Sequence, residues 1–283
     1  MANSNKANSF YRPELTQSGL APTCSVIAHD EYGNERETQI AGELPLTIYL
    51  DRKEIVTLMT LGGHPEALVL GFLKNQHLVK AIEDIKSVQV DWETNAVAVT
   101  TNNPVDDLEE RLEKRTVTTG CGQGTVFGDI MAGLDKIKLN RSPIKQSVIY
   151  DLLYNMREHN DVYKSAGAVH GCALCEGEKI LNFVEDVGRH NAVDAIAGMM
   201  WLDHVSGDNK IFYTTGRLTS EMVIKVSQMG ISVLLSRSGI TQMGLELAQK
   251  TGVTLIARAK GRHFLVFNGL ELIEYNAQPQ KRS

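Results

Sequence analysis

The chain has 283 residues, 42% hydrophobic and 22% charged, which is the balance of a globular protein rather than of a disordered or membrane protein. Its length is compatible with two domains that share an interface. The net charge of −5 argues against a nucleic-acid-binding surface, which is usually basic, so any phosphate site must be local. Apolar runs such as residues 69–73 are far shorter than the roughly 20 residues of a membrane span, and residues 1–18 lack the apolar core of a signal peptide. We therefore expect a cytoplasmic protein that does not enter a membrane.

The first half of the chain predicts a small α+β domain. Residues 1–22 are polar and predict a disordered tail. Runs rich in Val, Ile, Leu and Thr, separated by turn signals, predict strands at 24–29, 44–50, 54–61, 86–92 and 96–101. A first-turn proline supports a helix at 65–76, and a charged helix is expected at 104–114. We expect this domain to span residues 23–140 and to end in a cysteine loop.

The second half alternates helices with short apolar strands. Ser142 and Pro143 resemble a helix cap and predict a helix to about residue 159. The pattern then predicts a hairpin of strands 168–174 and 179–184, helices 191–202, 220–229 and 241–250, and strands 210–215, 231–235, 253–257 and 263–267. Gly230 and Gly252 follow helices where a left-handed cap is expected. The alternation predicts a largely parallel sheet covered on both faces, in an α/β domain at 141–270 with a tail at 271–283.

The cysteine loop, residues 119–125, is rich in glycine. Gly120, Gly122 and Gly124 surround Cys121 and let the backbone come close to another molecule. A buried structural cysteine would instead favour apolar neighbours. The loop therefore holds either a reactive thiol or an incidental cysteine in a glycine-rich turn. The cysteines, Cys24, Cys121, Cys172 and Cys175, are too few and too unevenly spaced for a disulfide framework.

Four polar clusters follow successive predicted strands, where ligands collect on such sheets. They are residues 185–191, 214–221, 236–239 and 258–263. Their hydroxyls, arginines and free helix N–H groups are the usual ingredients of a phosphate site. For residues 185–191 the alternative is a capped helix start with an internal Asp/Arg pair. Together the clusters predict a phosphorylated ligand of some size.

Several stretches resemble the formate dehydrogenase accessory sulfurtransferase family. They are Gly120-Cys121-Gly122, EDVGRHNAVD at 185–194, GRLTSEMV at 216–223 and Lys260-Gly261-Arg262, in an ordered match from about residue 43 to about residue 267. The resemblance implies a cytidine-deaminase-like α/β/α domain joined to a smaller α+β domain, and a homodimer. It also implies that sulfane sulfur from a cysteine desulfurase is carried to the molybdenum cofactor of formate dehydrogenase. That cofactor is Mo-bis(molybdopterin guanine dinucleotide).

The resemblance also implies roles for individual residues. Cys121 would carry the persulfide, because a thiolate is the nucleophile in sulfur exchange. The residues that would contact a guanine dinucleotide of the cofactor are Ala257, Arg258, Ala259, Lys260, Gly261 and Arg262. We add Arg217, Ser236 and Arg237 as further phosphate ligands, since the planar fork of arginine matches pyrophosphate. We also add His190 as a polar group near the sulfur path.

Two alternatives stay open. Many relatives carry a second cysteine three residues after the first, where this chain has Gly124, so transfer between two loop thiols is not available here. This difference suits a cofactor-binding chaperone that moves no sulfur. The spacing of His170, Cys172 and Cys175 instead suits the zinc site of a deaminase-like hydrolase. Against that site, Gly171 and not proline precedes Cys172, so the Pro-Cys-x-x-Cys part of the zinc deaminase signature is missing, and an extended strand would direct Cys175 away from the other two.

Overall fold

The computed structural model describes residues 10–105, 116–117, 124–125, 133–134 and 136–279. Cys121 and most of the helix expected at 104–114 lie outside these ranges. Within them, no helix has both the length and the apolar character that crossing a membrane requires.

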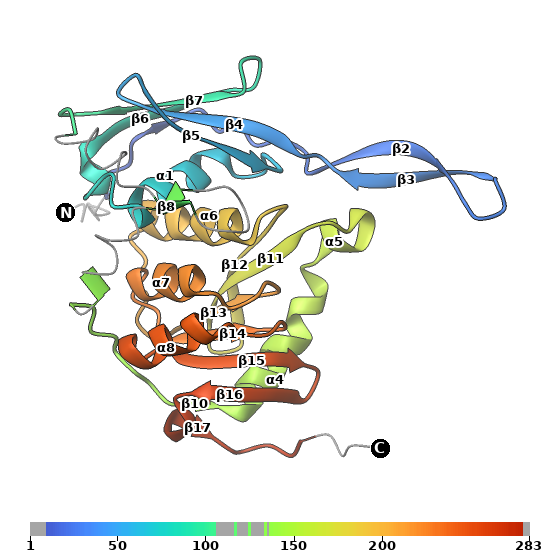
Figure 1. Cartoon of the computed structure of the whole chain (residues 1–283), viewed down its shortest axis with the longest axis vertical. Helices are drawn as coiled ribbons and strands as arrows, with labels where there is room; N and C mark the ends of the chain where they lie inside the picture. Colours follow the sequence, from blue (N-terminus) through green and yellow to red (C-terminus); the bar gives the residue numbers. More distant parts are fainter. Residues whose placement is uncertain (1–9, 106–115, 118–123, 126–132, 135, 280–283) are drawn as a thin grey trace, which may run out of the picture.

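A five-stranded sheet forms the part of the molecule built mainly from the first half of the chain (Figure 1). Its order is β1-β6-β7-β4-β5, and its strands are β1 (Glu14–Leu15), β4 (Leu44–Leu50), β5 (Lys53–Thr60), β6 (Ile85–Asp91) and β7 (Ala96–Thr101). Alternate residues of β7 are buried, as the period of a half-buried strand requires. Helix α1 (Pro65–Asn75) is almost wholly buried against this sheet and against the rest of the molecule. The short elements nearby are the 3₁₀ turn η1 (Ile82–Asp84) and the strand pair β8 (Thr116–Val117) and β9 (Gly124–Thr125).

Residues 10–22 do not form the expected disordered tail. Strand β1 pairs in parallel with β6. The Oγ1 of Thr16 donates to Glu66 Oε1 at 2.9 Å, and Trp92 Nε1 donates to the Ser18 carbonyl at 2.6 Å. For residues 10–22 the prediction is wrong because these polar residues are held by hydrogen bonds to distant parts of the chain, which composition does not reveal; the rest of the expected tail, residues 1–9, lies outside the described residues.

Strands β2 (Thr23–His29) and β3 (Glu35–Ala41) form an antiparallel hairpin that extends from the body of the molecule (Figure 1). β3 was not predicted, because its sequence ERETQIA has little apolar character and most of its residues are exposed.

The second half of the chain builds a six-stranded sheet of order β12-β11-β13-β14-β15-β16. Its strands are β11 (His170–Glu176), β12 (Lys179–Asp186), β13 (Lys210–Thr214), β14 (Val233–Ser236), β15 (Thr254–Lys260) and β16 (His263–Asn268). Only the β13–β14 and β14–β15 pairs are parallel, and the other three pairs are antiparallel. The prediction of a largely parallel sheet is therefore wrong. Tight turns at Gly177 and Gly261, both with positive φ, return β12 and β16 beside their neighbours.

Helix α4 (Gln146–Asn155) begins later than predicted. Residues 144–145 form strand β10 (Ile144–Lys145), which pairs with β17 (Ile273–Glu274). Ser142 and Pro143 are therefore not the helix cap, and residues 271–279 are not simply a tail. The remaining helical elements are η2 (Met156–Glu158), α5 (Asp161–Ala166), α6 (Arg189–Leu202), α7 (Ser220–Gln228), α8 (Gln242–Thr251) and η3 (Leu270–Leu272). Gly230 and Gly252 have φ of 76° and 78°, which confirms the predicted left-handed caps.

The six-stranded sheet is covered on both faces, as predicted. Residues of α4 form one hydrophobic core with one face, and residues of α6, α7 and α8 form another with the opposite face. The second of these cores continues through α1 into the five-stranded sheet. The boundary expected near residue 140 therefore does not divide the core.

Two glycines allow α1 and α6 to cross at backbone distance. A Cβ atom at Gly71 would lie 1.7 Å from the Asp194 carbonyl oxygen, and one at Gly198 would lie 1.9 Å from the Ala67 carbonyl oxygen. The contact fixes the position of α6, and with it the start of that helix at the sheet edge.

Candidate functional site

The four predicted polar clusters share one edge of the six-stranded sheet. Strands β13, β14 and β15 are parallel, and β12 runs in the same direction because it is antiparallel to β11, which is antiparallel to β13. The carboxyl ends of these four strands therefore lie together, next to the start of β11 at His170. The four clusters that the sequence places after successive strands therefore meet at this edge.

Three cavities line this edge, and we refer to them together as the edge groove. The first, of about 420 Å³, is lined by Tyr150, Asp151, Tyr154, Arg157, Gly261 and Arg262. The second, of about 100 Å³, shares Arg157 and Gly261 with the first and adds Arg237 and Lys260. The third, of about 350 Å³, shares Arg237 with the second and reaches His170. The side chains of Arg157, Arg237, Lys260 and Arg262 make the groove cationic in a chain with a net charge of −5.

Aromatic rings support two of these arginines in the first cavity. The guanidinium of Arg262 lies 5.9 Å from the ring centre of Tyr150, and that of Arg157 lies 5.9 Å from the ring centre of Tyr154. A guanidinium placed over a ring keeps its N–H fork free for phosphate or carboxylate oxygens. The sequence analysis named Arg262 but missed Tyr150, Tyr154 and Arg157. The signal was present, since Tyr150, Tyr154 and Arg157 recur at helical spacing, but only the apolar stripe of this helix was considered.

The predicted cofactor segment divides into buried and exposed positions. Ala257 is fully buried, whereas Arg258 is exposed and its backbone N–H donates to the Ser238 carbonyl at 2.9 Å. Residues 259–262 line the edge groove.

The other predicted phosphate ligands lie in different surroundings. Ser236 is fully buried, and its hydroxyl donates to the Gly216 carbonyl at 2.6 Å, so it organises the neighbouring loop. Arg237 lines the second and third cavities beside Tyr213, whose pKa burial raises to about 12 despite that positive charge. Arg217 is exposed and lines none of the three cavities.

His190 lies in a buried charge cluster rather than in the edge groove. We define this cluster as His190, Asp194, Glu221 and Lys225. The Nδ1 of His190 lies 3.0 Å from Glu221 Oε2, and Lys225 Nζ lies 2.7 Å from Asp194 Oδ2. Burial lowers the pKa of His190, which favours its neutral form. Burial would raise the pKa of Glu221, but the contact with His190 and the charge of Lys225 lower it to about 2.

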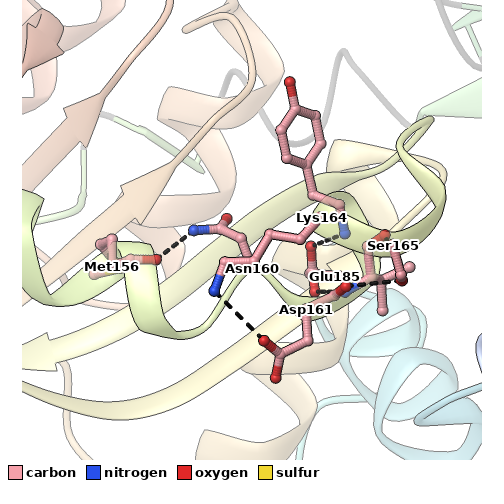
Figure 2. Close-up of polar contacts among 8 residues, drawn as sticks. Met156, Asn160, Asp161, Lys164, Ser165 and Glu185 are labelled. Atoms are coloured by element: carbon pink, nitrogen blue, oxygen red, sulfur yellow. Dashed lines mark hydrogen bonds and ion pairs between the residues drawn. The ribbon is translucent and has the colours of Figure 1, made fainter.

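The two acids before α6 bind backbone groups. Figure 2 shows Glu185 at the start of α5, where its carboxylate accepts from the N–H groups of Val162 and Tyr163, both at 2.9 Å. Asp186 accepts from Thr60 Oγ1 at 2.6 Å and from the Leu61 N–H at 3.1 Å, which ties β12 to the end of β5. The alternative of an internal Asp/Arg pair in residues 185–191 is therefore wrong.

The described cysteines do not form a joint site. Cys172 packs in the core shared with α6, Cys175 packs in the core shared with α4, and burial raises the pKa of each to about 12. His170 lines the third cavity. In the part of the chain that the structure describes, no three His, Cys, Asp or Glu side chains gather as metal ligands. The geometry therefore gives the zinc hypothesis no support.

Comparisons with known proteins agree with the sequence resemblance. Residues 41–274 match the FdhD/NarQ family. The sulfur carrier protein FdhD of Listeria monocytogenes serotype 4b (strain F2365) is 31% identical over 242 residues, covering 84% of this chain and 93% of the Listeria protein. The protein of the same name from Bacillus subtilis (strain 168) is 30% identical over 240 residues, covering 84% of this chain and 91% of the Bacillus protein.

A solved structure shares the fold. The crystal structure of a protein described as a formate dehydrogenase accessory protein from Desulfotalea psychrophila matches with a TM-score of 0.71 at 28% identity. The match covers 89% of this chain and 98% of that one, so the mixed α/β arrangement of both sheets is shared. From the family match over most of its length and the similarity to two sulfur carrier proteins, we conclude that the chain belongs to the FdhD/NarQ family.

Proposed function

We propose that this protein is a cytoplasmic sulfurtransferase that carries sulfane sulfur as a persulfide on Cys121. The donor is a cysteine desulfurase, and the acceptor is Mo-bis(molybdopterin guanine dinucleotide) destined for formate dehydrogenase. The observation that carries the proposal is the cationic edge groove of Arg157, Arg237, Lys260 and Arg262, present in a relative of sulfur carrier proteins.

The chemistry needs a single thiol. The Cys121 thiolate attacks the outer sulfur of the donor persulfide, the donor leaves as a thiolate, and Cys121 then holds the outer sulfur. On transfer, the acceptor donates an electron pair to the outer sulfur, and the S–S bond breaks with both of its electrons remaining on Cys121, which leaves as a thiolate; the acceptor thereby gains the sulfane sulfur. Gly124, where many relatives have a second cysteine, does not prevent either step.

The edge groove suits a ligand with two phosphorylated arms. Arginine and lysine side chains bind pyrophosphate oxygens through charge-assisted hydrogen bonds. Tyr154, which is 67% exposed, offers a ring face on which a purine base can stack, beside a cavity of about 420 Å³. The cavity at His170 leaves room for a second arm.

We also propose a cytidine-deaminase-like topology for the six-stranded sheet and a homodimer. The first is supported by the layering of α4 on one face and α6 to α8 on the other. The second rests on the family resemblance, and multi-angle light scattering of the purified chain tests it directly.

Intact-protein mass spectrometry after incubation with a cysteine desulfurase and cysteine tests the carrier role. Wild type should gain the mass of one sulfur atom, reversibly with a thiol reductant, and Cys121→Ala should not. Cys24→Ala is the matched control, because Cys24 is an exposed thiol and should not affect loading. An equal gain in Cys121→Ala, or none in wild type, would refute sulfur carriage and leave the cofactor-binding chaperone as the function to test.

Nucleotide binding tests the groove separately. Arg262→Gln should weaken binding of GDP, a fragment of the proposed cofactor, by about 10- to 100-fold, because a hydrogen bond to a charged group contributes roughly 1.5–3 kcal/mol. Lys86→Gln, at an exposed position of the other sheet, should bind GDP like wild type. Calorimetric titration measures both, and equal affinities for all three proteins would contradict the assignment.

A further inference from the structure

Arg189, the first residue of α6, is a buried cation that forms no ion pair among the described residues, although its charge and that of Glu221 on α7 attract each other at longer range. Arg189 is 6% exposed, and its Nε atom has no hydrogen-bond partner. Among the residues that the structure describes, no carboxylate forms an ion pair with it. Burying an ionised group without a partner is strongly unfavourable, so we expect an anion to bind beside Arg189.

The acids nearest in sequence cannot supply that anion. The carboxylate of Glu185 accepts from the N–H groups at the start of α5, and that of Asp186 accepts from Thr60, Leu61, Gly188 and Asn191. Both acids are therefore committed to other groups. The positive charge at the start of α6 is left uncompensated by its own loop.

Other features add to the positive potential at this place. Arg189 is at the first turn of a 14-residue helix that has no side-chain cap, so the positive end of the helix dipole lies at the same point. The pKa of His170 is lowered first by burial and then by the positive charges of Arg189 and Arg217. The neutral imidazole of His170 therefore lies near two positively charged side chains.

Glycine at position 216 holds the arginine in place. A Cβ atom there would lie 2.7 Å from Arg189 Cδ, so the aliphatic stem of Arg189 packs directly on the Gly216 backbone. Thr215, the preceding residue, lines the third cavity together with His170. Arg189 thus lies next to the His170 end of the edge groove, and none of the roles assigned above uses it.

We propose that Arg189 forms the base of an anion site beside the His170 end of the edge groove, with the exposed Arg217 as a second cation close by. The ligand is a compact oxyanion, either a free phosphate or sulfate ion or the phosphoryl group of a larger ligand. A site for a free ion does not require Cys121 or sulfur transfer and goes beyond the proposed function. A site for the phosphoryl group of a larger ligand deepens and rests on that function, in which the cavity at His170 holds a second arm.

His170 provides a local reporter for the test. In the full-length chain at constant ionic strength, replacing chloride by inorganic phosphate should raise the pKa of His170, measured by NMR of its imidazole signals. A bound anion cancels the positive charges that lower this pKa. In Arg189→Gln the pKa of His170 should already be higher, and phosphate should not shift it further. His170→Gln identifies the signal, and Lys86→Gln should behave like wild type.

A second variant guards against loss of folding. Arg189→Lys keeps the charge but not the planar fork, so its His170 pKa should stay low while half-saturation needs at least about tenfold more phosphate. Repeating the titration with GDP separates the two sources of the oxyanion. A shift with phosphate indicates a free ion, and a shift only with GDP indicates a phosphoryl group of a larger ligand. No shift with either ligand, or the same shift in Arg189→Gln as in wild type, would overturn the proposal.

Discussion

Replacing Lys225 by methionine should strongly destabilise the protein, because this residue is half of a buried ion pair. Lys225 is 2% exposed, Asp194 is fully buried, and the Nζ–Oδ2 distance is 2.7 Å. The other Asp194 oxygen accepts from Asn75 at 2.7 Å. Removing one partner of a buried pair typically costs about 3–5 kcal/mol, because a buried charge is left uncompensated. At about 2–4 °C per kcal/mol for chains of this size, the melting temperature should fall by roughly 6–20 °C.

A double-mutant cycle separates the pair from ordinary loss of packing. Asp194→Asn keeps the hydrogen bond with Asn75 but removes the negative charge, so it should cost as much as Lys225→Met. The double variant should cost about 1–3 kcal/mol less than the sum of the two single variants, since Asp194 and Lys225 no longer leave each other unpaired, although Glu221 still loses the charge of Lys225. Chemical denaturation followed by circular dichroism gives the four free energies of unfolding. Single variants that cost less than about 1 kcal/mol, or costs that simply add, would show that the pair is not a buried, coupled one.

Three further predictions concern stability. Gly71→Ala should destabilise the folded protein by about 1–3 kcal/mol or more, since the new Cβ would lie 1.7 Å from the Asp194 carbonyl oxygen. A melting temperature equal to that of wild type would contradict the close crossing of α1 and α6. Thr241→Ala should cost about 1 kcal/mol, because the Thr241 hydroxyl caps α8 by accepting from the Gly244 N–H at 3.2 Å; Thr241→Ser should retain most of that stability. Glu221, whose pKa is about 2, stabilises the folded state above about pH 4.5, and this stabilisation is lost as the pH falls towards 2. The free energy of unfolding measured between pH 5 and pH 2 should therefore fall less in Glu221→Gln than in wild type.

Local sequence patterns predicted most of the helices and strands, because the buried residues of each one recur with the period of that helix or strand. The strands at 44–50 and 96–101 have the predicted bounds, and α1 ends one residue before its predicted end. Strand β3 and the pairings of β1 and β17 were missed. Those segments gain their structure from hydrogen bonds with distant strands or lie exposed to solvent, so their sequences carry no apolar period.

The candidate site was predictable only where it lies at strand ends. The sequence located the clusters after β12, β13, β14 and β15, and strand direction then brought them to one edge. It could not show that Ser236 turns inward, because a serine at a strand end is compatible with a buried or an open hydroxyl. It also could not show that the acids at 185 and 186 bind backbone groups instead of Arg189, since that depends on where β5 and α5 pack.

Helix α6 connects the stability of the protein to its groove. Its first residue is Arg189, its middle carries Asp194 of the buried ion pair, and Gly198 packs on the backbone of α1. Asp186, just before the helix, is bound by residues of the five-stranded sheet. The first sheet is therefore a support that fixes where the cationic end of α6 meets the edge groove. For this reason a substitution that shifts α1 should weaken anion binding at Arg189 as well as the fold, whereas a change at the exposed tip of the β2–β3 hairpin, such as Tyr32→Ser, should affect neither.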